Sequence, residues 1–237
     1  MQESRFLCLA VSRRDSGNCI AGIDLDSGKW IRPINAGTHG AFGDHEIFVV
    51  DAGTQKRRIL SLLDVVRLRL DKYVGNHAQP ENWEVAPGSY ESPYTLLRRF
   101  DRPRDIEVLD CYLNRNGPLL HSYSNKVQAD DLFASQLSRS LSIIDPEQLH
   151  WKIAAHPIYP NNLKVEADFR FDGDPYCLVV TDPIWEARCR RFGRGRIPHS
   201  AIAGDLGGQV LLTISLAEVP LRGYHYKLVA GVVNLPG

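Results

Sequence analysis

The stretch FLCLAVSRRDSGNCIAGIDLDSGKWIRPI (residues 6–34) decides our prediction of the fold. Residues 6–11 are apolar on both faces, which is typical of a central strand. RRDSGN (residues 13–18) and DSG (residues 26–28) have the composition of tight turns. The apolar runs that follow these turns predict two more strands, at residues 19–23 and 29–32. Three short strands joined by tight turns are typical of small β-barrels.

The second half of the chain also has strand periodicity. In KVEADFRF (residues 164–171), apolar and polar residues alternate strictly, which predicts a half-buried strand. A turn at residues 172–175 leads into the next apolar run. Further strands are predicted at residues 66–70, 176–181, 209–216 and 226–233. In the first of these, Arg67 and Arg69 share the outer face.

The middle of the chain has helix signals instead. Ser92-Pro93 and Asp145-Pro146-Glu147 each place a capping residue before proline, as at a helix start, and residues 130–137 are a third helix candidate. We therefore predict a mostly β fold with a helical middle. The expected organisation is an N-terminal barrel (residues 1–90), a helical or loop connecting region (residues 91–149) and a C-terminal barrel (residues 150–237), with the barrels packed together.

Composition limits the function classes. The 28 Lys and Arg residues balance the 28 Asp and Glu residues, so any nucleic-acid contact must depend on a local patch. No apolar run is long enough to span a membrane, and the N-terminal residues do not resemble a signal peptide, so we expect a cytoplasmic protein without membrane contact. Five irregularly spaced cysteines predict free thiols rather than disulfides or a metal site.

The strongest local feature is WEARCRRFGRGRIP (residues 185–198). Two glycines, Gly193 and Gly195, suggest a mobile loop. Its arginines suit phosphates and its aromatic rings suit bases, so we predict nucleic-acid contacts from Arg188, Arg190, Arg191, Arg194, Arg196, Trp185 and Phe192. The alternative is a solvated basic loop that pairs with acidic neighbours.

A second candidate surface combines Arg13 and Arg14 with Trp30 and Arg32. Strand alternation places Trp30 and Arg32 on one face, where they would form a platform for a base and a phosphate. The alternative is that Trp30 packs in the barrel core and Arg32 is a surface cation. Residues 224–227 (YHYK) form a third cluster, for which stacking and core packing are both open.

Catalytic signals are weak. The sequence contains no GxSxG, P-loop or complete GxGxxG motif, so we predict no catalytic residue, cofactor or metal. Asp172 and Asp174 lie in a glycine turn, where aspartate is common. Asp182 follows a strong strand directly before the basic segment, where it would orient an arginine or act as a base.

The chain resembles the dual OB-containing domain family. Blocks that carry the resemblance span both halves in order: residues 6–34, LLDVV (62–66), QPENW (79–83), VVTDP (179–183) and YKLVAGVV (226–233). The resemblance implies two OB-like barrels and an association with bacterial conflict or antiphage systems. OB barrels host many ligands, so the fold alone does not fix the function.

These patterns together predict a module that binds single-stranded or structured DNA or RNA, and that could serve as a subunit of a bacterial defence or nucleic-acid-processing complex. Two alternatives remain open. One is a nucleotide-acting enzyme or nucleotide sensor, and the other is a protein–protein adaptor whose basic loop meets an acidic partner.

Overall fold

The structure is a computed structural model that describes residues 2–14, 17–38, 40–51, 53–85, 94–135, 139–157, 159, 162–204, 208–218 and 220–235. The chain forms two compact units, each with its own sheet. Unit 1 comprises Met1–Cys111 and Leu137–Ser140, and unit 2 comprises Tyr112–Gln136 and Leu141–Gly237. The region predicted to connect two barrels contributes strands to both units.

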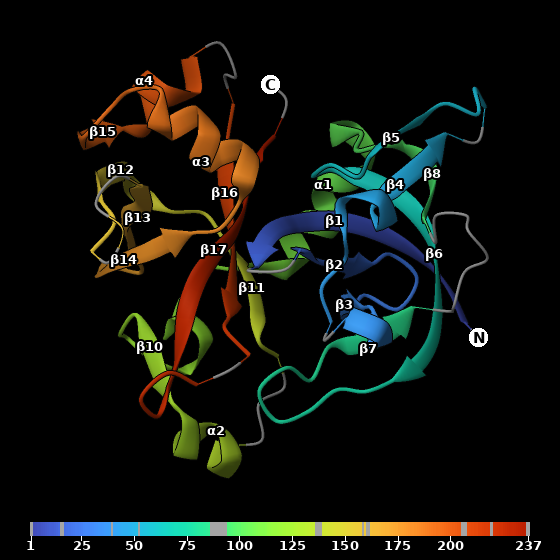
Figure 1. The fold of residues 1–237 in the computed structure, drawn as a ribbon, viewed down its shortest axis with the longest axis horizontal. Coiled ribbons are helices and arrows are strands. Elements are labelled where there is room, and N and C mark those ends of the chain that lie inside the picture. Colours follow the sequence, from blue (N-terminus) through green and yellow to red (C-terminus); the bar gives the residue numbers. More distant parts are fainter. Residues whose placement is uncertain are drawn as a thin grey trace. The chain divides into compact units, whose positions relative to one another are not determined.

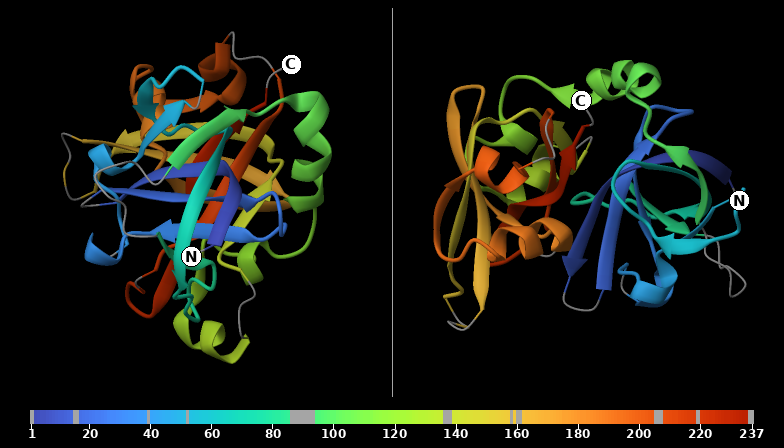
Figure 2. Two further views of the ribbon diagram at one scale, coloured as in Figure 1. Left: turned by 90° about the vertical axis from the view of Figure 1, so that its right-hand side faces the viewer. Right: turned by 90° about the horizontal axis from the view of Figure 1, so that it is seen from above.

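Unit 1 contains a closed five-stranded barrel (Figures 1 and 2). Its strands, in spatial order, are β1 (Gln2–Arg14), β2 (Gly17–Asp24), β3 (Trp30–Ile34), β7 (Asn82–Val85) and β6 (Asp64–Tyr73). The ring closes because β1 pairs antiparallel with both β2 and β6, while β3 and β7 run parallel. Apolar side chains such as Phe6, Val66 and Leu68 fill the interior. The predicted meander of three strands is confirmed.

Three further strands and one α-helix complete unit 1. They are β4 (Phe48–Asp51), β5 (Arg57–Ile59), β8 (Tyr94–Arg99) and α1 (Arg102–Tyr112), with short 3₁₀ turns at Ala36–Thr38 and Asp44–Glu46. The prediction that Ser92-Pro93 leads into a helix is wrong for the residues that follow. Tyr94 and Leu96 are buried and alternate with more exposed neighbours, and β8 pairs with β6. Ser92 and Pro93 themselves lie outside the described residues.

Unit 2 repeats the same strand order in an open, half-barrel sheet. The order is β12 (Glu147–Ala155), β13 (Leu163–Phe171), β14 (Asp174–Val180), β17 (Tyr224–Asn234), β16 (Val210–Leu216) and β11 (Leu141–Ile144). β14 and β17 are parallel, as β3 and β7 are in unit 1. β11 and β12 are consecutive segments that pair with β16 and β13 respectively, so together they take the place of β1.

The remaining elements of unit 2 lie at its edges and ends. They are β9 (Leu113–Asn114), β10 (Lys126–Gln128), β15 (Gly195–Pro198), α2 (Ala129–Ser135), α3 (Pro183–Arg190), α4 (His199–Ala203) and a 3₁₀ turn at Leu119–His121. The helix expected near residue 130 is confirmed by α2. The helix expected from Asp145-Pro146-Glu147 is wrong, because Glu147 begins β12 and pairs with Arg170. None of the helices among the described residues is long and apolar enough to cross a membrane.

Candidate nucleic-acid interface

The basic segment is not the mobile loop that its glycines suggested. It folds as α3, a tight turn and β15. Asp182 caps α3, because its Oδ1 accepts from the backbone N–H groups of Ile184 and Trp185, each at 3.0 Å. Its Oδ2 accepts from Val232 N at 3.0 Å. Asp182 therefore fixes the helix to the sheet, and the expectation that it orients an arginine is wrong.

Trp185 faces the interior of unit 2. Its side chain is buried, and its ring stacks on His199 with a centroid separation of 5.5 Å and an angle of 13°. The ring of Trp151 in β12 lies 5.1 Å away. Burial also lowers the pKa of His199. The indole of Trp185 is thus part of the core and is not presented for stacking on a base.

Arg188 is also used internally. Its Nε donates to Ile202 O and its Nη2 to Ala203 O, both at 2.7 Å. The guanidinium lies 5.7 Å from the ring of Trp185. These contacts tie α3 to α4, so Arg188 holds the segment together.

The other arginines of the segment are exposed. Residues 190–196, named here the arginine turn, connect α3 to β15. Arg190 pairs with Glu186 at 2.9 Å and Arg196 pairs with Asp168 at 2.8 Å. Arg191 and Arg194 have no ion-pair partner among the described residues.

The backbone of the arginine turn is compact. Gly193 has φ of 75°, a left-handed conformation that favours glycine, and its N–H donates to Arg190 O. Phe192 is 47% exposed in this turn. The exposed Phe192 thus follows Arg191 directly and lies two residues before Arg194, and these two arginines have no ion pair in the described part of the chain.

β15 is the edge strand beside β12, so it brings the arginine turn to this edge of the unit 2 sheet (Figure 1). Arg196 lies opposite Lys152 of β12, which in turn lies opposite Glu166 of β13. Lys152 and Lys164 share Glu166, with N–O distances of 3.6 and 2.6 Å. The outer face here carries Lys152, Lys164 and Arg196 together with Glu166 and Asp168, so among these five residues the basic side chains outnumber the acidic ones by one.

The loop after β12, residues 156–162, adds an aromatic platform at the same end of that strand. Tyr159 is 61% exposed, and its ring stacks on His156 at 5.4 Å and 28°. Because Gly195 pairs with Ile153, the arginine turn enters β15 close to where β12 ends. Tyr159 is not among the residues predicted from the sequence. The sequence feature that could have indicated it is a tyrosine between the strands that became β12 and β13 of unit 2.

The second predicted surface is largely interior. Trp30 and Arg32 are each only 8% exposed. Arg32 donates to Ser140 Oγ at 3.0 Å, and that hydroxyl donates to Glu81 Oε2 at 2.8 Å. Trp30 thus packs in the core, and the expectation that Arg32 is a surface cation is wrong.

The remaining residues of that surface lie near the end of β1. Arg13 is exposed. Arg14 belongs to β1, but its side chain lies outside the described part of the chain. The structure therefore does not bring the four residues together as one exposed platform.

The cluster in residues 224–227 divides between two faces. Lys227 is buried, and its Nζ donates to Ser122 O and Ser124 O, both at 2.6 Å. Tyr224 is half-buried, with Lys126 Nζ 3.6 Å from the centre of its ring. The lysine of this cluster thus forms its hydrogen bonds inside unit 2 and is not presented to a ligand.

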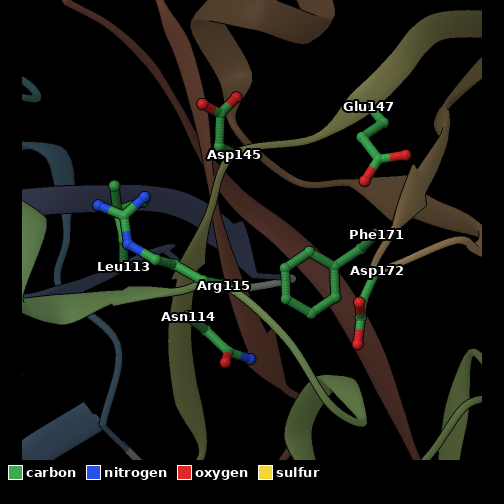
Figure 3. A pocket seen from close by; sticks show the side chains of 7 residues that line it. All are labelled: Leu113, Asn114, Arg115, Asp145, Glu147, Phe171 and Asp172. Atoms are coloured by element: carbon green, nitrogen blue, oxygen red, sulfur yellow. The ribbon is translucent and has the colours of Figure 1, made fainter.

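A small recess in unit 2 was not predicted as a site from the sequence (Figure 3). It is lined by Leu113, Asn114, Arg115, Asp145, Glu147, Phe171 and Asp172. Three carboxylates and one guanidinium give it negative character, which would repel a phosphate. Among the described residues, no group of three or more His, Cys, Asp or Glu side chains is arranged to hold a metal ion.

Both units have the strand order of an OB fold, with the third and last strands parallel. A family model described as the dual OB-containing domain matches residues 4–232. The chain belongs to this family. No curated protein and no solved structure matches it.

OB barrels bind oligonucleotides and oligosaccharides across their second and third strands, with help from the loops after strands one and four. In unit 2 of this dual OB-containing chain, the second and third strands are β13 and β14, and the loop after the first is residues 156–162. The arginine turn lies at the same sheet, beyond β12. In unit 1, the corresponding residues Trp30 and Arg32 are buried.

Proposed function

We propose that this chain binds single-stranded or structured nucleic acid, and that the contact is the arginine turn with the adjoining outer face of unit 2. The observation that carries the proposal is the pair Arg191 and Arg194. Both are exposed and lack an ion-pair partner among the described residues, and in sequence they lie on either side of the exposed Phe192. Arg190 and Arg196 are already in ion pairs with Glu186 and Asp168, so they attract a phosphate less strongly and are secondary contacts.

The chemistry favours a strand with unstacked bases. Guanidinium forks bind phosphate oxygens in pairs. Exposed rings such as Phe192 and Tyr159 can stack on bases, and a base is accessible to them only where it is not already stacked in a duplex. We therefore infer a preference for single strands or loops over a regular duplex.

The test is fluorescence anisotropy with single-stranded and duplex DNA and RNA over a range of salt. Arg191→Ala/Arg194→Ala should weaken binding and flatten the slope of log affinity against log salt by about 0.7 per lost contact on a single strand. Phe192→Ala should weaken binding, by roughly 1–3 kcal/mol per stacked base, with little change in that slope.

A matched control removes two arginines elsewhere. Arg67 and Arg69 are exposed on β6 of unit 1 and lie 3.9 and 3.6 Å from Glu3. Arg67→Ala/Arg69→Ala lowers the net charge equally and should leave both affinity and salt slope close to those of the parent. If Arg191→Ala/Arg194→Ala binds nucleic acid as tightly as the parent at low and physiological salt, the arginine turn is not the binding site.

The other function classes give different outcomes in the same assay. A nucleotide-acting enzyme would convert free nucleotides, and a nucleotide sensor would bind them without turnover. A protein adaptor would leave nucleic acids unbound and would need an acidic protein partner. Membership of a bacterial defence or processing complex, and a cytoplasmic location, stay predictions.

A further inference from the structure

Two basic segments of unit 1, far apart in sequence, meet at one buried carboxylate. Arg58 of β5 and Arg99 of β8 both donate to Asp64, whose side chain has 0% exposure. Arg58 binds it with both Nη atoms, at 2.6 and 2.7 Å, and Arg99 binds it with Nη1 at 2.5 Å. Figure 1 shows β5 and β8 on either side of β4, in agreement with their pairing.

The single carboxylate neutralises only one of the two guanidinium groups. Ser61 N also donates to Asp64 Oδ2, at 2.9 Å, so both carboxylate oxygens are already bonded. Arg99 remains 57% exposed, and Asp64 engages one of its Nη atoms. Its Nε–H and other Nη group have no hydrogen-bond partner in the described part of the chain, so they form a fork that is held in place for a further acceptor.

Further charged side chains lie near this pair of arginines in the chain. Lys56 and Arg57 precede Arg58 and are exposed. Arg98 is neutralised separately, by a bidentate contact with Asp105, whose side chain is 4% exposed. The carboxylates of Asp64 and Asp105 are thus enclosed beneath arginines, whereas Asp51 of β4 is partly exposed and also interacts with Arg58.

We propose that Arg99, held by Asp64 beside Arg58, forms a phosphate-binding site on unit 1 for a linear polyanion with closely spaced phosphate groups. The backbone of a nucleic acid and inorganic polyphosphate share this chemistry. The proposal rests on the proposed function for the nature of the natural ligand, but its location is independent of the arginine turn. A guanidinium whose orientation is already fixed loses little side-chain entropy when it binds phosphate.

The test compares Arg99→Gln with Arg69→Gln in full-length protein, using an oligo-dT strand and inorganic polyphosphate as probes. Asp64 keeps Arg58 and Ser61 N in Arg99→Gln, so its melting temperature should stay near that of the parent. Arg69 is a matched control because it is 67% exposed in the same unit and 3.6 Å from Glu3. Arg99→Lys is a further variant that keeps the charge but lacks the fork.

Arg99→Gln should lower the salt slope for oligo-dT by about 0.7, which corresponds to about fivefold weaker binding at 0.1 M salt. Arg69→Gln should change neither quantity. Arg99→Lys should bind more weakly than the parent with an unchanged slope. If Arg99→Gln binds both probes as the parent does, or if both Gln variants weaken binding equally, the site is refuted.

The two proposals fail separately. Loss of polyphosphate binding in Arg99→Gln, with no binding of oligo-dT by the parent, would support the Arg99 site and reject the proposed function. If Arg99→Gln binds oligo-dT more weakly while Arg191→Ala/Arg194→Ala binds it as the parent does, the Arg99 site is supported and the arginine turn is rejected. A parent protein that binds neither probe would overturn both.

Discussion

Lys227 carries an ammonium group into unit 2, where its side chain is 2% exposed. Two carbonyl oxygens and the Ser122 hydroxyl accept from Nζ and favour the charged form, but burial acts in the opposite direction. Burial prevails and lowers the pKa of Lys227 to about 7. The folded state therefore gives up this proton at a lower pH than the unfolded state does.

The sign of the resulting pH dependence follows from the protons bound. Between about pH 7 and the ordinary lysine pKa of 10.5, the unfolded chain binds more protons at Lys227 than the folded chain. The free energy of unfolding should thus rise with pH across this window. Lys227→Met should remove that contribution, so urea unfolding of parent and variant at about pH 7 and about pH 9.5 should show a smaller rise in the variant. An equal rise in both would contradict the assignment.

The hydrogen bonds of Asp182 can be tested by replacing one acceptor oxygen with a donor. In Asp182→Asn, the amide oxygen can still accept from Ile184 and Trp185, but the NH₂ group would face the N–H of Val232. Two donors then meet in a buried site, which should cost roughly 1–3 kcal/mol. Thermal unfolding should show a lower melting temperature for Asp182→Asn. An unchanged value would mean that the Val232 contact contributes little.

Ser140 links two buried charged residues, so its hydroxyl can be tested directly. In Ser140→Ala, Arg32 and Glu81 each lose one hydrogen bond within unit 1. We expect a loss of roughly 1–3 kcal/mol in unfolding free energy because each buried charged group loses a hydrogen-bond partner. Ser27→Ala, which removes an exposed hydroxyl bonded to Asp24, is the comparison and should cost less. Equal losses in urea unfolding of the two variants would contradict this role for Ser140.

At the scale of elements, Trp185 in α3 is buried and structural, whereas Phe192, just after α3, is exposed and available to a ligand. Trp185→Ala would leave a cavity against Trp151 and His199, and should reduce the unfolding free energy by roughly 3–5 kcal/mol. Phe192→Ala should leave stability nearly unchanged because that ring is 47% exposed. Denaturant unfolding of the two variants checks the contrast. Similar losses in both would show that Phe192 also packs.

Strands were predictable where one face is buried and the other is exposed. β13 is the clearest case, with Val165, Ala167 and Phe169 buried. β8 was mistaken for a helix because its Leu-Leu-Arg-Arg sequence suits either structure, and pairing with β6 decides between them. Tertiary contacts outweigh such weak local preferences.

The candidate site was only partly predictable for the same reason. Sequence spacing identified a basic segment, but Trp185 and Arg188 turn inward while Arg191 and Arg194 stay exposed, and that division depends on how α3 packs. Tyr159 and Arg99 were missed because their neighbours in space are not evident from sequence spacing. Asp64 and Arg99 belong to different strands, and the sequence alone does not show that these two residues lie opposite each other.

At the scale of the whole molecule, the thiols give a prediction that is independent of function. None of the five cysteines, all of which lie in the described part of the chain, forms a disulfide. Denatured, unreduced protein should therefore titrate as five thiols per chain with a chromogenic disulfide reagent. A count lower by two in freshly prepared protein would indicate a disulfide.

The closing of the unit 1 barrel has a consequence for the order in which the chain acquires its structure. The hairpin of β1 and β2 joins residues near each other in sequence, whereas the pairing of β1 with β6 joins Phe6 to Val66. Bringing distant segments together costs chain entropy before any contact compensates for it, so refolding should be slow for a domain of this size. The hairpin can form early on the ribosome, but the ring cannot close until β6 has left the exit tunnel.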